Sequence, residues 1–192
     1  MSLQWMLRFG AVCGVVLGLS LGVPGAIEAF TGETAITSFI VGLGMAFAAP
    51  ALTAIYLRQS KAAGRFGAVA YAVNLIGLGL FAGVGFSLNL VLFFLDEAVV
   101  KELLAGPTRF AIQGSALVFV VGTVLFGISL IRAKVFPRIP SWGYGITLTM
   151  LAVLAPLPDT LFTSSMHILA CASLVWLALS TWSGDDPALA RP

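Results

Sequence analysis

Long apolar segments, separated by short turns that carry nearly all of the charged residues, constrain this chain more than any other feature. Only 9% of its 192 residues are charged and 59% are hydrophobic, whereas a water-soluble domain has about 25% charged residues. Crossing about 30 Å of hydrocarbon takes about 20 helical residues, and most of the apolar segments reach that length. The sequence therefore predicts an all-α, multi-pass membrane protein, in which residues 1–192 form one membrane-embedded helical bundle.

We expect six membrane spans, at residues 9–27, 35–57, 66–95, 110–131, 142–157 and 160–182. A short helix on the outer membrane surface is expected at residues 96–104, with Asp96 capping its start, and a polar tail at residues 183–192. The third span is longer than a bilayer requires, and the glycines between residues 77 and 85 predict a bend within it. The fifth span is short and ends near Pro156, so whether it crosses completely stays open.

Lysine and arginine residues gather on one side of the alternating spans. Eight of the ten lie there, namely Arg8, Arg58, Lys61, Arg65, Arg132, Lys134, Arg138 and Arg191. The other side holds six of the eight acidic residues and two cations, Lys101 and Arg109. Because lysine and arginine resist translocation during insertion, we expect the basic side to be cytoplasmic, and both chain ends with it. The Trp and Tyr residues map to the same half, where their rings favour the headgroup region.

The first apolar segment follows a single cation, Arg8, as the apolar part of a secretory signal would. Residues 23–29 lack a small-x-small cleavage pattern, so we expect a retained membrane helix. Cleavage, which is the alternative, would leave five spans with the same orientation. Both cysteines, Cys13 and Cys171, fall inside expected spans, which argues against a disulfide framework.

Four glycines at strict four-residue spacing, Gly10, Gly14, Gly18 and Gly22, form the most specific pattern of the sequence. Residues four apart lie on one face of a helix, so these glycines make a stripe without side chains. Helices in lipid associate through close packing, and small residues let their backbones approach. We expect this glycine stripe to pack on another helix of the same chain. The alternative is a contact with a second copy of the chain or with a partner subunit.

The sixth span carries polar residues at four-residue intervals on one helix face: Asp159, Thr163, His167 and Cys171. Polar residues at membrane depth are unfavourable unless they face protein or water, so they are candidate functional residues. His167 is the only histidine, and a neutral imidazole could relay protons or bind a ligand. The structural alternative makes Asp159 a helix N-cap, bonds Thr163 to its own helix and leaves His167 as a packing residue.

Two asparagines of the third span, Asn74 and Asn89, could join this polar face, because they project within about 60° of each other on a helix. The predicted ligand site therefore consists of Asp159, Thr163, His167, Asn74 and Asn89. Asparagine also serves commonly as a hydrogen-bonding contact between membrane helices, which is the structural alternative here.

Several kinds of site are missing from the sequence. A single histidine excludes a zinc site built from several histidines and bis-histidine haem ligation. The expected spans contain no lysine, and the chain has no glycine-rich phosphate loop and no Gly-x-Ser-x-Gly motif. We therefore predict no catalytic residue, cofactor or metal ion. The net charge of +2 is too small to indicate nucleic-acid binding, so the expected partner is the lipid bilayer.

The turn after the fourth span resembles a loop found in other membrane proteins. The stretch from Gly127 to Arg138, followed by Trp142 and Gly143, resembles the inner loop of several uncharacterised multi-span bacterial proteins of unknown function. The resemblance covers less than a tenth of the chain, chiefly Arg132 to Arg138. It implies a bacterial inner (plasma) membrane and no particular activity.

Three functional classes stay open. The predicted one is the binding or transport of a small molecule or ion through an outward-facing polar cavity near His167. The acidic residues at the rim of this cavity would favour cations. The second is a non-catalytic accessory or assembly subunit of a larger membrane complex, which would bury the glycine stripe against a partner. The third, and least expected, is an intramembrane enzyme that uses His167 and Asp159 as acid–base groups.

Overall fold

The computed structural model describes residues 2–155 and 160–183, and these residues form helices joined by short connections, without a strand. The helices are α1 (Leu3–Thr31), α2 (Ala35–Gly44), the 3-10 helix η1 (Met45–Phe47), α3 (Ala48–Leu90), the 3-10 helix η2 (Leu92–Phe94), α4 (Glu97–Ala105), α5 (Pro107–Ala133), α6 (Arg138–Leu154) and α7 (Leu161–Trp182). The prediction of an all-α chain is confirmed.

Four of the helical stretches in the described residues are long and apolar enough to cross a membrane: α1, the stretch Ala35–Phe94, α5 and α7. At 1.5 Å per residue, the 29 residues of α1 extend about 44 Å, which exceeds the hydrocarbon thickness. Large apolar side chains are exposed around the bundle, for example Phe30, Phe110 and Ile36 at 86%, 75% and 74%. Such a surface is unfavourable in water and suits contact with lipid.

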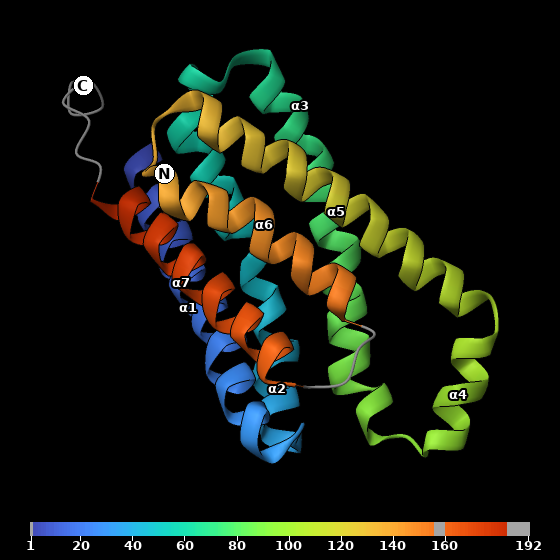
Figure 1. The fold of residues 1–192 in the computed structure, drawn as a ribbon. Coiled ribbons are helices and arrows are strands. Elements are labelled where there is room, and N and C mark those ends of the chain that lie inside the picture. The colour runs from blue at the N-terminus through green and yellow to red at the C-terminus, as the bar shows by residue number, and fades with distance from the viewer. Residues whose placement is uncertain (1, 156–159, 184–192) are drawn as a thin grey trace.

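The stretch Ala35–Phe94 reverses direction at Gly64 (Figure 1). Gly64 has φ 56° and ψ −153°, a backbone conformation that a residue without Cβ adopts at no steric cost. It divides α3 into a first arm (residues 48–63) and a second arm (residues 65–90). The turn therefore lies where the sequence predicts one, but it is tighter. Gly64 is the residue of α3 with non-helical dihedral angles, and the glycines between residues 77 and 85 keep helical ones.

The helices are arranged as two closely packed pairs with α6 between them. Antiparallel helices α1 and α7 form one pair, and the second arm of α3 packs along α5 to form the other. Helix α6 contacts α5 on one side and α7 on the other, so it joins the pairs (Figure 1). The buried core lies between them, and Phe126, Leu130 and Leu177 are its largest fully buried apolar side chains.

The charged residues that the structure describes lie near helix ends, and these ends are found at opposite ends of the bundle (Figure 1). One end, called the basic end below, contains the start of α1, the Gly64 turn and the α5–α6 connection, with the cations Arg8, Arg58, Lys61, Arg65, Arg132, Lys134 and Arg138. The acidic end contains the α1–α2 connection and α4, with Glu28, Glu33, Asp96, Glu97, Glu102, Lys101 and Arg109. The guanidinium of Arg8 lies 5.5 Å from the ring centre of Trp182, which places the end of α7 at the basic end.

The starts of α4, α6 and α7 bear on the sequence-based expectations. Asp96 occupies the N-cap position of α4, but its side chain makes no capping hydrogen bond. Helix α6 begins at Arg138, four residues earlier than expected, and has 17 residues. Helix α7 begins at Leu161 with Thr160 as its N-cap. The expectation that Asp159 caps this helix is therefore wrong, and Asp159 itself lies outside the described residues.

Candidate functional site

His167 and Thr163 lie on α7, where their polar groups bond within their own helix. The Nδ1 atom of half-buried His167 is 3.0 Å from the Thr163 carbonyl oxygen. The Thr163 hydroxyl oxygen accepts a hydrogen bond of 2.7 Å from the Thr160 backbone N–H, and the Thr160 hydroxyl oxygen accepts one of 3.2 Å from the Thr163 N–H. This reciprocal capping box satisfies two N–H groups at the helix start. These bonds agree with the structural alternative given above, in which Thr163 bonds to its own helix and His167 is a packing residue.

Asn74 is fully buried and connects three helices. Its Nδ2 donates a hydrogen bond of 2.6 Å to the Tyr144 hydroxyl of α6. The Thr123 hydroxyl of α5 lies 3.4 Å from Asn74 Oδ1 and also donates to the Phe119 carbonyl oxygen at 2.7 Å. Buried polar groups are usually hydrogen-bonded, and here the strongest bond between helices joins Asn74 to Tyr144, while Thr123 lies beside them. We call Asn74, Thr123 and Tyr144 the central polar cluster.

Asn89 does not belong to either group. It is half-buried near the end of the second arm of α3, where its Nδ2 donates 2.8 Å to the carbonyl oxygen of Gly85 in the same helix. The two asparagines therefore have different roles, one between helices and one within a helix. Of the predicted site residues that the structure describes, none of the α7 residues hydrogen-bonds to Asn74 or Asn89.

The glycine stripe is buried against helices of the same chain. A Cβ atom on Gly14 would lie 2.9 Å from Ala178 Cβ, and one on Gly18 would lie 2.9 Å from Val175 Cγ2, both on α7. A Cβ on Gly22 would overlap Cys171 of α7, and one on Gly10 would overlap Ala54 of α3. The intramolecular packing of the stripe is thus as predicted. Each of the four glycines is therefore covered by another helix of the same chain, α3 for Gly10 and α7 for the other three.

Close packing of α3 on α5 depends on two glycines that the sequence analysis did not single out for packing. A Cβ on Gly77 would lie 2.6 Å from the Phe119 Cα, and one on Gly122 would lie 2.5 Å from the Asn74 Cα. Each glycine therefore faces backbone of the other helix. Gly77 and Gly122 belong to different helices, so no periodic pattern in the sequence could have revealed them as a pair.

Gln59 and Ser129 form a second buried polar contact, nearer the basic end. The Gln59 side chain is fully buried, and its Nε2 lies 3.4 Å from the Ser129 hydroxyl oxygen, which is a long donor–acceptor distance. The Oε1 atom of Gln59 has no hydrogen-bond partner among the described residues. No sequence pattern predicts this contact, because Gln59 follows Arg58 in a stretch that was expected to be a polar turn.

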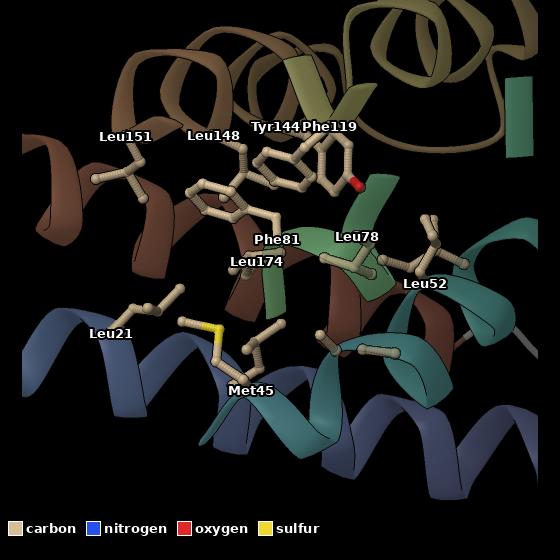
Figure 2. Close-up of a pocket in the computed structure, with 14 residues that line it drawn as sticks. Leu21, Met45, Leu52, Leu78, Phe81, Phe119, Tyr144, Leu148, Leu151 and Leu174 are labelled. Atoms are coloured by element: carbon tan, nitrogen blue, oxygen red, sulfur yellow. The ribbon is translucent and has the colours of Figure 1, made fainter. Parts of the chain in front are cut away.

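A cavity of about 60 Å³ lies where the two helix pairs meet α6, as Figure 2 shows. Its lining comes from α1, η1, both arms of α3, α5, α6 and α7. The lining residues are Leu17, Leu21, Met45, Ala48, Ala51, Leu52, Ile55, Leu78, Phe81, Phe119, Tyr144, Leu148, Leu151 and Leu174. All but Tyr144 have side chains without a hydrogen-bonding oxygen or nitrogen. His167 and Thr163 do not line it.

The lining determines what the cavity can hold. Tyr144 is its one hydroxyl-bearing residue, and the hydrogen bond from Asn74 already occupies that hydroxyl. A water molecule needs roughly 10–15 Å³ and two to four polar partners, so this cavity has the volume for water but lacks the partners. A hydrated ion would lack compensation for its lost hydration in the same way. An apolar molecule or chain end is the occupant that this chemistry accepts.

Neither a group of metal ligands in the described residues nor a match to a known protein identifies a function for this site. Among the residues that the structure describes, no three His, Cys, Asp or Glu side chains are grouped so that they could hold a metal ion. Comparisons with protein-family models, with curated proteins and with solved structures find no match to this chain.

Proposed function

We propose that the chain crosses a bacterial inner membrane six times, with the basic end in the cytoplasm. The alternation of helix ends between the basic and acidic ends supports six crossings, since α1, the two rods on either side of Gly64, α5, α6 and α7 run between them (Figure 1). The 17 residues of α6 extend only about 26 Å, so this helix would cross where the bilayer is locally thin. The excess of lysine and arginine supports the cytoplasmic placement of the basic end.

Thiol labelling of intact cells tests this topology. In a Cys13→Ala/Cys171→Ala background, a membrane-impermeant maleimide should label Glu97→Cys directly and Lys61→Cys only after permeabilisation. Both positions are exposed, so accessibility within the fold is matched. The opposite labelling would overturn the orientation. Labelling of both positions in intact cells would place them on one side and overturn the crossing pattern between them.

We further propose that the protein binds the apolar end of a small molecule that is dissolved in the membrane. The observation that carries this proposal is the central cavity, whose wall comes from helices throughout the bundle and offers apolar contacts. Drug-sized ligands fill pockets of about 300–1,000 Å³, whereas this cavity measures about 60 Å³, so it would hold a chain end of a few carbon atoms. The cavity thus favours binding of an apolar ligand over passage of an ion.

Photolabelling with a diazirine-bearing short alkane tests this binding. In nanodiscs, the probe should label lining residues such as Leu52 and Phe81, and peptide mass spectrometry would identify them. Ala48→Val should reduce this labelling because its added methyl groups occupy the cavity, and Leu148→Ala should increase it because it enlarges the cavity. Ala172→Val, the same change at an exposed position of α7, is the matched control.

The two cavity variants are expected to change labelling in opposite directions, which separates binding from general destabilisation. Equal labelling of Leu52 and Phe81 in Ala48→Val, Leu148→Ala and the unmodified protein would overturn the proposal. Melting temperatures measured on the same samples establish that each variant is folded.

A second candidate function, an accessory subunit of a membrane complex, is favoured by the exposed part of α3. One face of residues 76–90 is exposed, since the exposed positions recur at three- and four-residue intervals: Ile76, Gly79, Leu80, Gly83, Phe86 and Ser87. A Cβ atom on Gly79 or Gly83 would meet nothing within 4 Å. This face, rather than the buried glycine stripe, is where a partner would have to pack. Native mass spectrometry after gentle detergent extraction tests the idea, because a subunit should retain a stoichiometric polypeptide partner. An enzyme built on His167 and Asp159 is not proposed further, since no observation favours it.

A further inference from the structure

In the part of the chain that the structure describes, the basic end of the bundle carries cations and the carboxylates lie elsewhere. Seven cations lie at this end, whereas the carboxylates of the described residues lie at the acidic end. Six of the seven cations are exposed: Arg8, Lys61, Arg65, Arg132, Lys134 and Arg138. Clustered like charges repel each other, so an anion from outside the described chain would stabilise this end.

The two basic turns form one surface rather than two. The guanidinium of Arg132, at the end of α5, lies 5.1 Å from the ring centre of Phe66, directly after Arg65. Beneath this contact the buried Gln59 side chain approaches Ser129, joining the first arm of α3 to α5. These contacts place the turn that carries Lys61 and Arg65 next to the turn that carries Arg132, Lys134 and Arg138. We call this surface the paired basic turns.

Aromatic residues place the paired basic turns at the level of lipid headgroups. Trp5, Trp142 and Trp182 are 49%, 55% and 49% exposed, and they lie near the starts of α1 and α6 and at the end of α7. Exposed tryptophans prefer the boundary between hydrocarbon and headgroups. The anions available at that level are lipid phosphates, which contact basic surfaces between membrane helices.

We propose that the paired basic turns bind an anionic phospholipid, and that a headgroup with two phosphates binds more tightly than one with a single phosphate. The exposed cations are Lys61 and Arg65 on one turn and Arg132, Lys134 and Arg138 on the other, so a two-phosphate headgroup can contact both turns at once. Guanidinium groups suit phosphate because they donate two parallel hydrogen bonds to its oxygens. This proposal rests on insertion of the bundle into a membrane and is independent of the cavity and of the orientation.

Native mass spectrometry with defined lipids tests the proposal. The detergent-solubilised protein would be titrated with phosphatidylcholine, phosphatidylglycerol and diphosphatidylglycerol, and the occupancy of each would be measured. We expect diphosphatidylglycerol to bind at least tenfold more tightly than phosphatidylcholine, with phosphatidylglycerol between them. Arg65→Gln/Arg132→Gln should weaken the binding of diphosphatidylglycerol at least fivefold.

A matched control exists at the other end of the molecule. Lys101→Gln/Arg109→Gln removes the same number of charges from the acidic end and should change the affinity less than twofold. Because Arg132 also contacts Phe66, Lys134→Gln/Arg138→Gln provides a second variant whose residues make no such ring contact. It should weaken binding in the same direction. Arg65→Lys/Arg132→Lys should restore most of the affinity.

Three results would overturn the proposal. Equal affinity for the three lipids would mean that the cations serve only to orient the chain during insertion. Equal losses in the basic-end and acidic-end variants would mean that net charge, not this surface, attracts the lipid. Displacement of the lipid by glycerol phosphate at equal concentration would identify a soluble phosphate ester as the ligand. Ala48→Val should leave the lipid preference unchanged, so failure of cavity binding is distinguishable.

Discussion

The two helix pairs of the bundle are both closed by glycine, but in different ways. Along α1 and α7, glycines face side-chain atoms of the partner helix, such as Ala178 Cβ and Val175 Cγ2. Along α3 and α5, Gly77 and Gly122 face backbone atoms, and the central polar cluster adds hydrogen bonds. The second pair also opens toward the acidic end, where a Cβ on Gly83 or Gly114 would meet nothing within 4 Å.

This difference indicates that glycine positions in one molecule can differ in how well they tolerate substitution. A side-chain atom at a helix surface can move by a few tenths of an ångström, whereas the backbone of a packed helix cannot move without disturbing its neighbours. The α3–α5 pair should therefore be the less tolerant of the two. The predictions below test this contrast in order of decreasing expected effect.

Gly122→Ala should have the largest effect, because its Cβ would lie 2.5 Å from the Asn74 Cα. We expect the free energy of unfolding to fall by about 3 kcal/mol, as for overpacked cores. Thermal unfolding in a fixed detergent would measure it. Gly83→Ala is the control, since its Cβ has open space and alanine favours helix by about 1 kcal/mol. Equal melting temperatures for the two variants would contradict the backbone contact.

Asn74→Leu should be the next most destabilising change. It removes the partner of the Tyr144 hydroxyl, and an unpaired buried hydroxyl costs about 1–3 kcal/mol. Asn89→Leu is the matched control, because Asn89 bonds only to its own helix, and its effect should be less than half as large. The unfolding free energies of the two variants decide the matter. A larger loss of unfolding free energy in Asn89→Leu than in Asn74→Leu would mean that the central polar cluster does not stabilise the fold.

Gly14→Ala should have a smaller effect, about 1 kcal/mol, because its Cβ would meet the Ala178 Cβ at 2.9 Å and α7 can shift slightly. Ala178→Gly removes that atom, so the double variant should recover most of the lost stability. A double-mutant cycle of melting experiments measures this coupling. Absence of coupling would mean that the glycine stripe does not contact α7 at this position.

His167→Ala should have the smallest effect, less than about 1 kcal/mol, which is typical for loss of one hydrogen bond. The bond that it removes is local to α7, and alanine keeps the Cβ atom that packs on Gly25. Labelling of the cavity by the alkyl diazirine should also be unchanged, since His167 does not line it. A loss of labelling in this folded variant would return His167 to the candidate site.

The predicted site could be assessed only in part from the sequence. The four-residue spacing on the sixth span correctly placed Thr163 and His167 on one helix, but the structure uses their polar groups within that helix. Asn74 was recognised as a residue worth naming, although its partners Thr123 and Tyr144 lie 49 and 70 residues away along the chain. The burial of Gln59 and the apolar cavity could not be predicted from the sequence, because both depend on which helices are neighbours.

The sequence by itself determined the helical class, the positions of the turns and the separation of charge between them, because these follow from local hydropathy and from the 3.6-residue period of a helix. The glycine stripe belongs to this group, since its spacing lies within one helix. Tertiary structure alone decided that Gly77 and Gly122 face each other's helices, that Asn74 bonds to Tyr144, and that helices throughout the bundle line an apolar cavity. These features arise from contacts between distant segments, which no single segment encodes.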